Sequence, residues 1–547
     1  MSALNTLIHS LWLGRAYKDY RYFKDHFAES LQIQERRLMD CVQNNASTAF
    51  GKEHRFSSID GIASFRRNIP IREYDEYVHW LERTLGGEER VLTQERILLF
   101  QPTGGTSSGS KLIPYTQSLK REFQKGIHAW VFDLYRRIPS MLRGRGYWSI
   151  TPKVVEKDYT KDGIPIGFEE DTEYLGRTGK FLEKILVAPA EMNRIGNIDN
   201  LRYITLYFLL LARDLALISV WNPSFLTLLL DDLNRYSEGL LRDIHDGGLE
   251  PPVEEDLDFL RTSCRPSPAR AKALEAMLHL PAAERYARIW PELKLISCWK
   301  EGPSHHHAKA LSRIFPGVIM QGKGLIATEG FMSFPLFEAR GNVPAYTSHF
   351  LEFLAEGEES TKHVGELEEG QTYSVILTTG GGLYRYNLKD KIQVTGKYKG
   401  MPLITFLGRD KVSDMVGEKL EETHVQDVMQ TTLERHGIEI EFLLVSPQIE
   451  EKGGHYVLFL ESKNEMEKGL SDIISTEIEE GLRRNFHYRH ARDLGQVLAL
   501  RVFVIEKDGT QAYFRRCVED GQNLGDVKHV VLDRRTGWAD HFSGRFI

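Results

Sequence analysis

A glycine- and hydroxyl-rich segment that ends in a lysine follows a short apolar run, Ile97 to Phe100. It comprises, in order, Thr103, Gly104, Gly105, Thr106, Ser107, Ser108, Gly109, Ser110 and Lys111. Glycines let backbone N–H groups approach an anion closely, hydroxyls add donors, and the lysine adds a positive charge. This chemistry suits a triphosphate, although a solvated serine–glycine turn is the alternative. The segment is not a Walker A loop, because Leu112 follows Lys111 where that motif requires Ser or Thr.

Two later segments carry further polar groups that suit a nucleotide. Thr328 and Glu329 follow an apolar run, and a carboxylate there can hold Mg²⁺, which prefers oxygen ligands and bridging phosphates. Taken alone, such a pair is more typical of an exposed turn. Asp390 can accept charge-assisted hydrogen bonds from two ribose hydroxyls, and Phe406 can stack on a base. The alternative for these two residues is a β-hairpin with a surface aspartate and a core phenylalanine.

Two other runs invite a functional interpretation but favour a structural one. The three histidines at 305–307 point in different directions, which favours a solvated turn over a metal site. The three glycines at 380–382 favour a tight turn before Tyr384 over a second phosphate loop.

The order of the three polar segments resembles that of adenylate-forming enzymes. Within that superfamily the chain resembles the Gretchen Hagen auxin-responsive family of acyl-acid amido synthetases. The resemblance spans nearly the whole chain and rests on TAFG (48–51), FRRNIPI (65–71), KLIP (111–114), HFLEF (349–353), YRYNLKD (384–390), NFHYR (485–489) and GQNLGDVK (521–528).

The resemblance implies an ATP-dependent ligase. Such an enzyme activates a carboxylic acid as its acyl-adenylate with release of pyrophosphate, then transfers the acyl group to an amine or amino acid. ATP and Mg²⁺ are the implied cofactors. The same resemblance assigns roles to single residues: phosphate binding to the loop from Thr103 to Lys111 and to Thr328, Mg²⁺ ligation to Glu329, ribose binding to Asp390, nucleotide contacts to Phe406 and Lys419, the adenylation step to Lys528, and the hinge between domains to Arg409.

The chain departs from the family pattern in two of these segments. Gly104 and Ser108 replace a hydroxyl residue and a glycine in the first loop, and Lys389 stands where the family has glycine before the aspartate. A left-handed backbone at 389 would be strained for lysine.

The elements that must position these groups alternate between strands and helices, which favours an α/β fold with buried sheets. We predict strands at 97–100, 147–150, 294–299, 317–321, 373–378 and 403–408, and helices at 118–137 and across 197–285. The apolar stretch 203–221 is interpreted as a buried core helix, and the acid pocket is expected within 120–240.

After residue 408, shorter strands (439–445, 456–461, 497–506) alternate with helices near 420–435 and 465–485. We therefore predict a large N-terminal domain, 1–408, with sheets flanked by helices, and a smaller, mobile α+β lid domain, 409–547.

Composition excludes several function classes. The net charge of -7 argues against a nucleic-acid partner. The four cysteines form no C-x-x-C pair, which argues against a zinc or redox motif and suits a reducing compartment. Arg213 and Asp214 interrupt the longest apolar stretch, so no membrane insertion is expected. The prediction is a soluble, cytoplasmic enzyme of unknown oligomeric state. An acyl-CoA ligase or a non-catalytic nucleotide-binding protein is the alternative.

Overall fold

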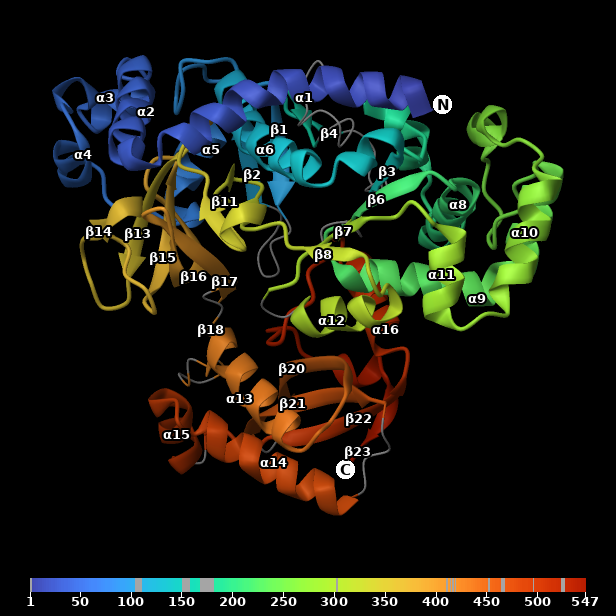
Figure 1. Cartoon of the computed structure of the whole chain (residues 1–547). Coiled ribbons are helices and arrows are strands. Elements are labelled where there is room, and N and C mark those ends of the chain that lie inside the picture. The colour runs from blue at the N-terminus through green and yellow to red at the C-terminus, as the bar shows by residue number, and fades with distance from the viewer. Residues whose placement is uncertain are drawn as a thin grey trace. The chain divides into compact units, whose positions relative to one another are not determined.

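The computed structural model describes residues 2–103, 111–149, 158–167, 182–301, 304–409, 412–413, 415, 418, 420–450, 453–463, 468–494, 496–522 and 527–547. The chain divides into two units (Figure 1). The first unit comprises Met1–Trp299, Leu311–Leu388 and Ile392–Phe406, and the second comprises Lys300–Ala310, Lys389–Lys391 and Leu407–Ile547. The functional division into domains 1–408 and 409–547 stays a prediction.

Helices build the N-terminal part of the first unit. Their bounds are α1 Ser2–Asp25, α2 Ser30–Asn44, α3 Ala49–Glu53, α4 Ile62–Asn68, α5 Val78–Leu85 and α6 Gln117–Arg137. Helix α6 begins where the Thr116 hydroxyl accepts a hydrogen bond from the Leu119 N–H at 3.1 Å, which is a typical N-cap. Helix α1 lies along α6, and the rings of Tyr20 and Phe132 meet with centroids 4.7 Å apart. These aromatic contacts fix the position of α6 against α1.

A parallel sheet lies beside α6 in the order β3-β6-β7-β8. Its strands are β3 Arg145–Trp148, β6 Leu215–Ser219, β7 Leu295–Ser297 and β8 Ile319–Gln321. The crossover segments contain α8 Ile198–Leu211, α9 Pro223–Asp246, α10 Pro268–Leu278 and α11 Ala282–Ile289. The prediction of one core helix over 203–221 is wrong, because the helix ends at Leu211 and the buried strand β6 follows. A short apolar run cannot be assigned to helix or strand by periodicity alone.

A larger sheet and several small ones complete the first unit. The larger sheet has the order β11-β12-β17-β16-β15-β13-β14. Its strands are β11 Ser333–Leu336, β12 Gly341–Pro344, β13 Phe350–Ala355, β14 Thr361–Lys362, β15 Thr372–Thr378, β16 Tyr386–Tyr398 and β17 Met401–Arg409. The small sheets contain β1 Leu99–Thr103, β2 Lys111–Tyr115, β4 Asp158–Tyr159, β5 Pro165–Ile166, β9 Ile326–Ala327 and β10 Gly330–Phe331. Side chains from α1, α2, α6 and the larger sheet share one hydrophobic core.

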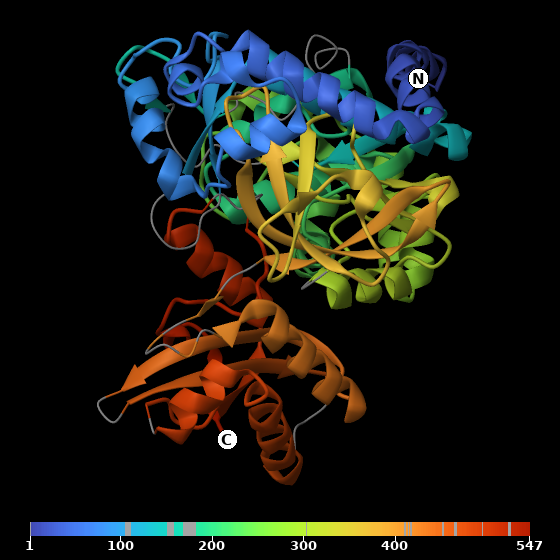
Figure 2. The same cartoon turned by 90° about the vertical axis from the view of Figure 1, so that its left-hand side faces the viewer.

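The second unit is a sheet with helices on both faces. The long orange strands β20 Ile440–Glu450 and β21 Gly453–Ser462 pair antiparallel (Figures 1 and 2), and β22 Arg501–Lys507 and β23 Ser543–Phe546 follow in the sheet. Residues alternate across it: Val445 packs in a core with α13 and α14, whereas Phe442 meets Tyr513 at 5.8 Å between ring centroids. The remaining elements are α12 His305–Ile314, which begins in this unit, and β18 Val412–Ser413, β19 Leu420–Glu421, α13 Glu422–Arg435, α14 Lys468–Leu482, α15 Phe486–Asp493 and α16 Gly509–Glu519.

This architecture confirms the predicted α/β fold class. No helix in the part of the chain that the structure describes is long and apolar enough to cross a membrane. The histidine run is not the solvated turn that we predict, because α12 begins at His305 and His307 is buried. The tight turn predicted at 380–382 is confirmed: the Gly382 N–H donates to the Thr379 carbonyl at 3.2 Å, and Gly382 has φ +98°.

Candidate active site

The strands on either side of the predicted phosphate-binding loop form an antiparallel pair. Strands β1 and β2 pair antiparallel with Thr103 opposite Lys111, and Lys111 is the first residue of β2. Five of the predicted binding residues, Gly104, Gly105, Thr106, Ser107 and Ser108, lie outside the described residues, as does the side chain of Thr103. The Lys111 ammonium lies 5.1 Å from the centroid of the Tyr74 ring, and the Tyr74 hydroxyl accepts the Leu112 N–H at 2.8 Å. Tyr74 therefore holds the backbone next to Lys111 and contacts the lysine side chain.

The Thr328–Glu329 turn lies against the same hairpin. It joins β9 to β10, and the hydroxyl of Tyr115 in β2 donates to the Thr328 carbonyl at 2.5 Å. Glu329 is only 5% exposed, so the alternative of an exposed surface turn is wrong for this carboxylate. Burial raises the pKa of Tyr74, and the negative charge of Glu329 contributes in the same direction. The first two predicted segments are therefore neighbours in space.

The third predicted segment reaches the same carboxylate. The Tyr386 hydroxyl, at the start of β16, donates to Glu329 Oε1 at 3.4 Å. Residues from three stretches that are far apart in the sequence thus meet around Glu329. Such a buried carboxylate beside a lysine-bearing hairpin suits a metal–phosphate group, because Mg²⁺ is usually bound through one or two carboxylates plus phosphate oxygens. The described residues contain no cluster of three or more His, Cys, Asp or Glu side chains that could hold a metal by itself.

Within the third segment, the side chains divide between structural and candidate binding roles. The Arg385 guanidinium donates to Glu352 at 3.1 Å and to the Ile69 carbonyl at 2.8 Å, so this buried arginine ties the fold together. Lys389 has φ +59°, the left-handed conformation that we identify as strained for lysine. Asp390 is 2% exposed, and the alternative of a surface aspartate is therefore wrong. Phe406 is half-buried in β17 and packs against the core, and its stacking on a base stays a prediction.

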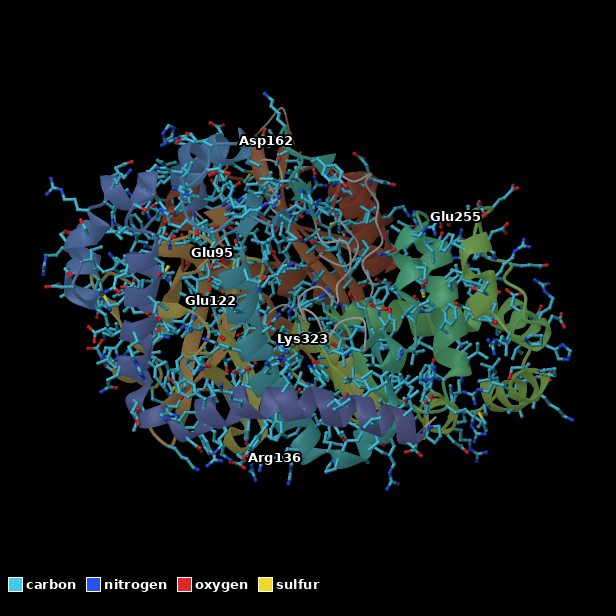
Figure 3. The ribbon with its side chains drawn as sticks, turned by 90° about the horizontal axis from the view of Figure 1, so that it is seen from above. Glu95, Glu122, Arg136, Asp162, Glu255 and Lys323 are labelled. Carbon is cyan, nitrogen blue, oxygen red and sulfur yellow. The ribbon has the colours of Figure 1, made fainter. Side chains whose placement is uncertain are left out.

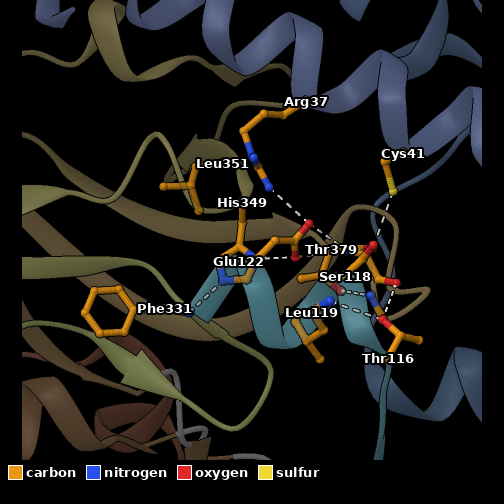
Figure 4. Close-up of polar contacts among 12 residues, drawn as sticks. Arg37, Cys41, Thr116, Ser118, Leu119, Glu122, Phe331, His349, Leu351 and Thr379 are labelled. Atoms are coloured by element: carbon orange, nitrogen blue, oxygen red, sulfur yellow. Dashed lines mark hydrogen bonds and ion pairs between the residues drawn. The ribbon is translucent and has the colours of Figure 1, made fainter. Parts of the chain in front are cut away.

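A buried network of Arg37, Glu122 and His349 holds the end of the Glu329 turn (Figure 4). None of these three residues is among the predicted site residues. The Phe331 N–H donates to His349 Nε2 at 2.9 Å, and His349 Nδ1 donates to Glu122 Oε2, also at 2.9 Å. Arg37 pairs with Glu122 at 3.1 Å. Because Nε2 accepts from a backbone amide, the imidazole must carry its proton on Nδ1. The network therefore fixes both the ring and the turn.

Glu122 also holds the glycine turn that precedes Tyr384. Its carboxylate accepts the Gly380 N–H at 3.0 Å, and the Thr116 hydroxyl donates to the Gly380 carbonyl at 2.9 Å. Burial opposes ionisation of this carboxyl, but His349, Arg37 and the Gly380 amide together leave the pKa of Glu122 below its ordinary value. The first two turns of α6 thus position both motif-bearing turns. The only sequence signal was a glutamate on the buried face of α6 and a histidine in the HFLEF segment.

The remaining predicted residues belong to the second unit. Lys528 is exposed, and its carbonyl accepts a hydrogen bond from the Tyr513 hydroxyl at 2.8 Å. Arg409 ends β17, and its side chain lies outside the described residues, as does the whole of Lys419. The roles of these three residues therefore stay predictions.

Comparison with known proteins identifies the family. Models of the GH3 family match the chain over three consecutive regions: the N-terminal domain over residues 20–320, the central domain over 343–409 and the C-terminal domain over 423–535. The chain is 23% identical over 532 residues to the indole-3-acetic acid-amido synthetase GH3.4 of Arabidopsis thaliana, covering 91% of this chain and 88% of the relative. It is 24% identical to the probable indole-3-acetic acid-amido synthetase GH3.11 of Oryza sativa subsp. japonica, covering 91% and 90%.

The fold agrees with solved structures of this family. The GH3.15 acyl acid amido synthetase superposes with a TM-score of 0.81 at 20% identity, covering 96% of both chains. A complex of the same enzyme with 2,4-DB gives a TM-score of 0.80 and covers 92% of this chain and 91% of the other. Family models that together cover most of the sequence leave one assignment: the chain belongs to the GH3 family.

Proposed function

We propose that this protein is an ATP-dependent ligase that activates a carboxylic acid as acyl-AMP and transfers the acyl group to an amine or amino acid. The proposal rests mainly on one observation. The segments that contain Lys111 and Tyr386 both contact the turn that carries the buried carboxylate of Glu329. Membership of the GH3 family, whose relatives are named acid-amido synthetases, supports the same reaction.

In the first half-reaction, a carboxylate oxygen of the acid attacks the α-phosphorus of ATP, and the bond to pyrophosphate breaks. Charge on the phosphoryl oxygens is stabilised by positioned cations and N–H donors. We assign this role to Lys111, to the loop from Thr103 to Ser108, and to Lys528. Thr328 contacts phosphate, and Glu329 would hold Mg²⁺, which supplies further charge neutralisation when bound.

We assign the orientation of the nucleotide to three further residues. Asp390 accepts hydrogen bonds from the ribose hydroxyls, Phe406 contacts adenine, and Lys419 makes a further nucleotide contact. In the second half-reaction, the neutral amine attacks the acyl carbon, AMP leaves, and the amine loses a proton. The acyl-adenylate must be shielded from water between the two steps. We assign the shielding to a lid domain, 409–547, which turns about Arg409.

None of the four cysteines forms a disulfide, which suits a reducing compartment, and we propose the cytoplasm as the site of the reaction.

Acid-dependent product analysis tests the proposed reaction. The full chain is incubated with ATP, Mg²⁺ and a library of carboxylic acids, and pyrophosphate and AMP are measured with and without amino acids as acceptors. We expect pyrophosphate release that requires an acid, and amide formation when an amino acid is added. Acid-dependent release of ADP and orthophosphate would instead indicate acyl-phosphate chemistry. A thioester formed with coenzyme A, and no amide, would place the chain among acyl-CoA ligases.

A further inference from the structure

A row of polar residues lies at the carboxyl ends of the parallel sheet in the first unit. Ser219 ends β6, Ser297 ends β7 and Gln321 ends β8, and the three lie in register on neighbouring strands. In open sheets of this kind, ligands bind beyond the carboxyl ends of the strands. All three side chains are buried, and Ser297 Oγ has no hydrogen-bond partner within the part of the chain that the structure describes. Among the described residues, the Ser297 hydroxyl at this edge is therefore left able to form a further hydrogen bond.

Lys323, two residues beyond β8, places a cation at this edge. The side chain is 5% exposed, and its ammonium donates to Ser219 Oγ at 2.7 Å (Lys323 is labelled in Figure 3). The ammonium lies 5.0 Å from the Trp221 ring centroid and 5.5 Å from that of Trp130, whose Nε1–H is held by Gln321 at 3.0 Å. Two indole faces stabilise a cation by cation–π attraction.

No carboxylate in the described part of the chain neutralises the cation. Burial lowers the pKa of Lys323 from 10.5 to about 8. A buried, unpaired ammonium is costly for the fold, and one of its three N–H groups is used by Ser219. Such an arrangement is typical of a site that an anionic ligand completes.

Helix α6 relates this cation to the reacting centre. The Glu329 turn meets α6 between Phe123 and Gly126: the Phe331 ring centroid lies 6.5 Å from that of Phe123, and a Cβ at Gly126 would lie 2.2 Å from the Phe331 ring. Lys323 meets the same helix at Trp130. The four to seven residues that separate these contacts from Trp130 rise by roughly 6–10 Å along the helix. The cation is therefore about one small-molecule length from the turn that carries Thr328 and Glu329, and the two do not compete for the same group.

We propose that Lys323 binds a second anionic group of the acid substrate, at the end remote from the carboxyl that is adenylated. The inference rests on the proposed function and narrows it: the substrate class is dicarboxylic acids, with the two acidic groups roughly 6–10 Å apart. Trp130 and Trp221 wall the site and exclude water, so that the ion pair forms in a medium of low dielectric constant, where it is stronger than in solution.

The test compares acids that differ only at the far end. Initial rates of acid-dependent pyrophosphate release are measured with linear α,ω-dicarboxylic acids and with the monocarboxylic acids of equal chain length. For each length, the ratio of kcat/KM for the diacid to kcat/KM for the monoacid is the readout. The wild-type ratio should exceed one at the matching length. Lys323→Met, which keeps the volume and removes the charge, should lower that ratio by about tenfold to a hundredfold.

Two controls separate the possible failures. Lys272→Met replaces an exposed lysine on α10 of the same unit and should leave the ratio unchanged. Tryptophan fluorescence, titrated with the diacid in the absence of ATP, should change in the wild type and not in Lys323→Met, which measures binding without activity. A wild type that releases no pyrophosphate with any acid defeats the proposed function itself. Pyrophosphate release with the same ratio in wild type and Lys323→Met overturns the assignment of Lys323 and leaves the proposed function intact.

Discussion

At the scale of single residues, the buried carboxylate of Asp390 allows the sharpest test of nucleotide binding. Replacing Asp390 by alanine should remove a charge-assisted pair of hydrogen bonds to ribose and weaken ATP binding by roughly 1.5–3 kcal/mol, or about tenfold to a hundredfold. Isothermal titration calorimetry measures the affinity. Asp246→Ala, at an exposed position at the end of α9, is the matched control and should leave it unchanged. Equal ATP affinity in wild type and Asp390→Ala would remove Asp390 from the site.

The buried lysine gives a prediction about pH and stability. Its pKa falls from 10.5 when unfolded to about 8 when folded, so the folded state resists protonation of this group. The resulting penalty is complete below pH 8, shrinks as pH rises from about 8 to 10.5, and is absent above that range; the shift corresponds to about 3 kcal/mol. Besides the lysine, the titratable group that acts on it is the Cys298 thiol, whose charge favours the ammonium.

The measurement is a pair of urea unfolding curves, followed by tryptophan fluorescence, at pH 7.5 and pH 9.5. The difference in midpoint between Lys323→Met and the wild type should narrow at the higher pH, because the wild type is relieved of its buried charge there. A constant difference at the two pH values would show that Lys323 is not a buried cation.

At the scale of elements, breaking the charged network on α6 should lower the free energy of unfolding by more than the loss of its hydrogen bonds alone. Glu122→Gln removes the charge that compensates Arg37 and disturbs the hold on both the Glu329 turn and the Gly380 turn. Breaking a buried pair in this way typically costs about 3–5 kcal/mol. Glu338→Gln is the matched comparison, because Glu338 also has Lys24 and Arg136 as partners but is 36% exposed, and exposed pairs contribute less than about 1 kcal/mol.

Denaturation midpoints of the two variants give the stability, and KM for ATP gives the effect on the site. The Glu122 variant should lose stability and raise KM, whereas the Glu338 variant should change neither appreciably. Equal effects in both variants would mean that α6 does not position the ATP site.

Some elements of the fold could be predicted from the sequence and others could not. Local signals sufficed for α6, where Thr116 caps a periodic helix, and for the glycine turn at 380–382. They failed at 203–221, where the charged pair Arg213–Asp214 marks the connection between α8 and β6 but periodicity does not show that a strand follows. The link between Glu122 and His349 joins residues that are 227 positions apart, and the buried Lys323 contacts Trp130 and Ser219, which are distant from it in the sequence. Such contacts depend on tertiary structure, which periodicity and spacing do not encode.

At the scale of the whole molecule, we predict that Lys528 acts in the adenylation step and not in the transfer of the acyl group. Lys528 lies in the second unit, in the GQNLGDVK segment that resembles the family's adenylation lysine. A lysine that stabilises charge only in the transition state should lower turnover and leave ATP affinity nearly intact. Lys528→Ala should therefore slow acid-dependent pyrophosphate release by about 10²–10³-fold. It should spare transfer from a chemically supplied acyl-adenylate to the amine, because that step uses another position of the lid.

Both half-reactions are measured on the same preparation, and Lys507→Ala, an exposed lysine at the end of β22, serves as the control. Equal loss of both steps in a folded Lys528 variant would remove support for a lid with two working positions. Full activity in both steps would make Lys528 an ordinary solvated lysine.

The sharing of Glu122 among Arg37, His349 and Gly380 also constrains how the chain can drift over generations. Losing one charged partner strands a buried ion, so each single replacement lowers fitness even if the final combination is harmless. Replacing the three members together by neutral residues that still accept from the Gly380 and Phe331 N–H groups avoids that penalty. Descendants of this protein should therefore retain Arg37, Glu122 and His349 together or exchange them as a set, and double-mutant combinations at these positions should be far from additive.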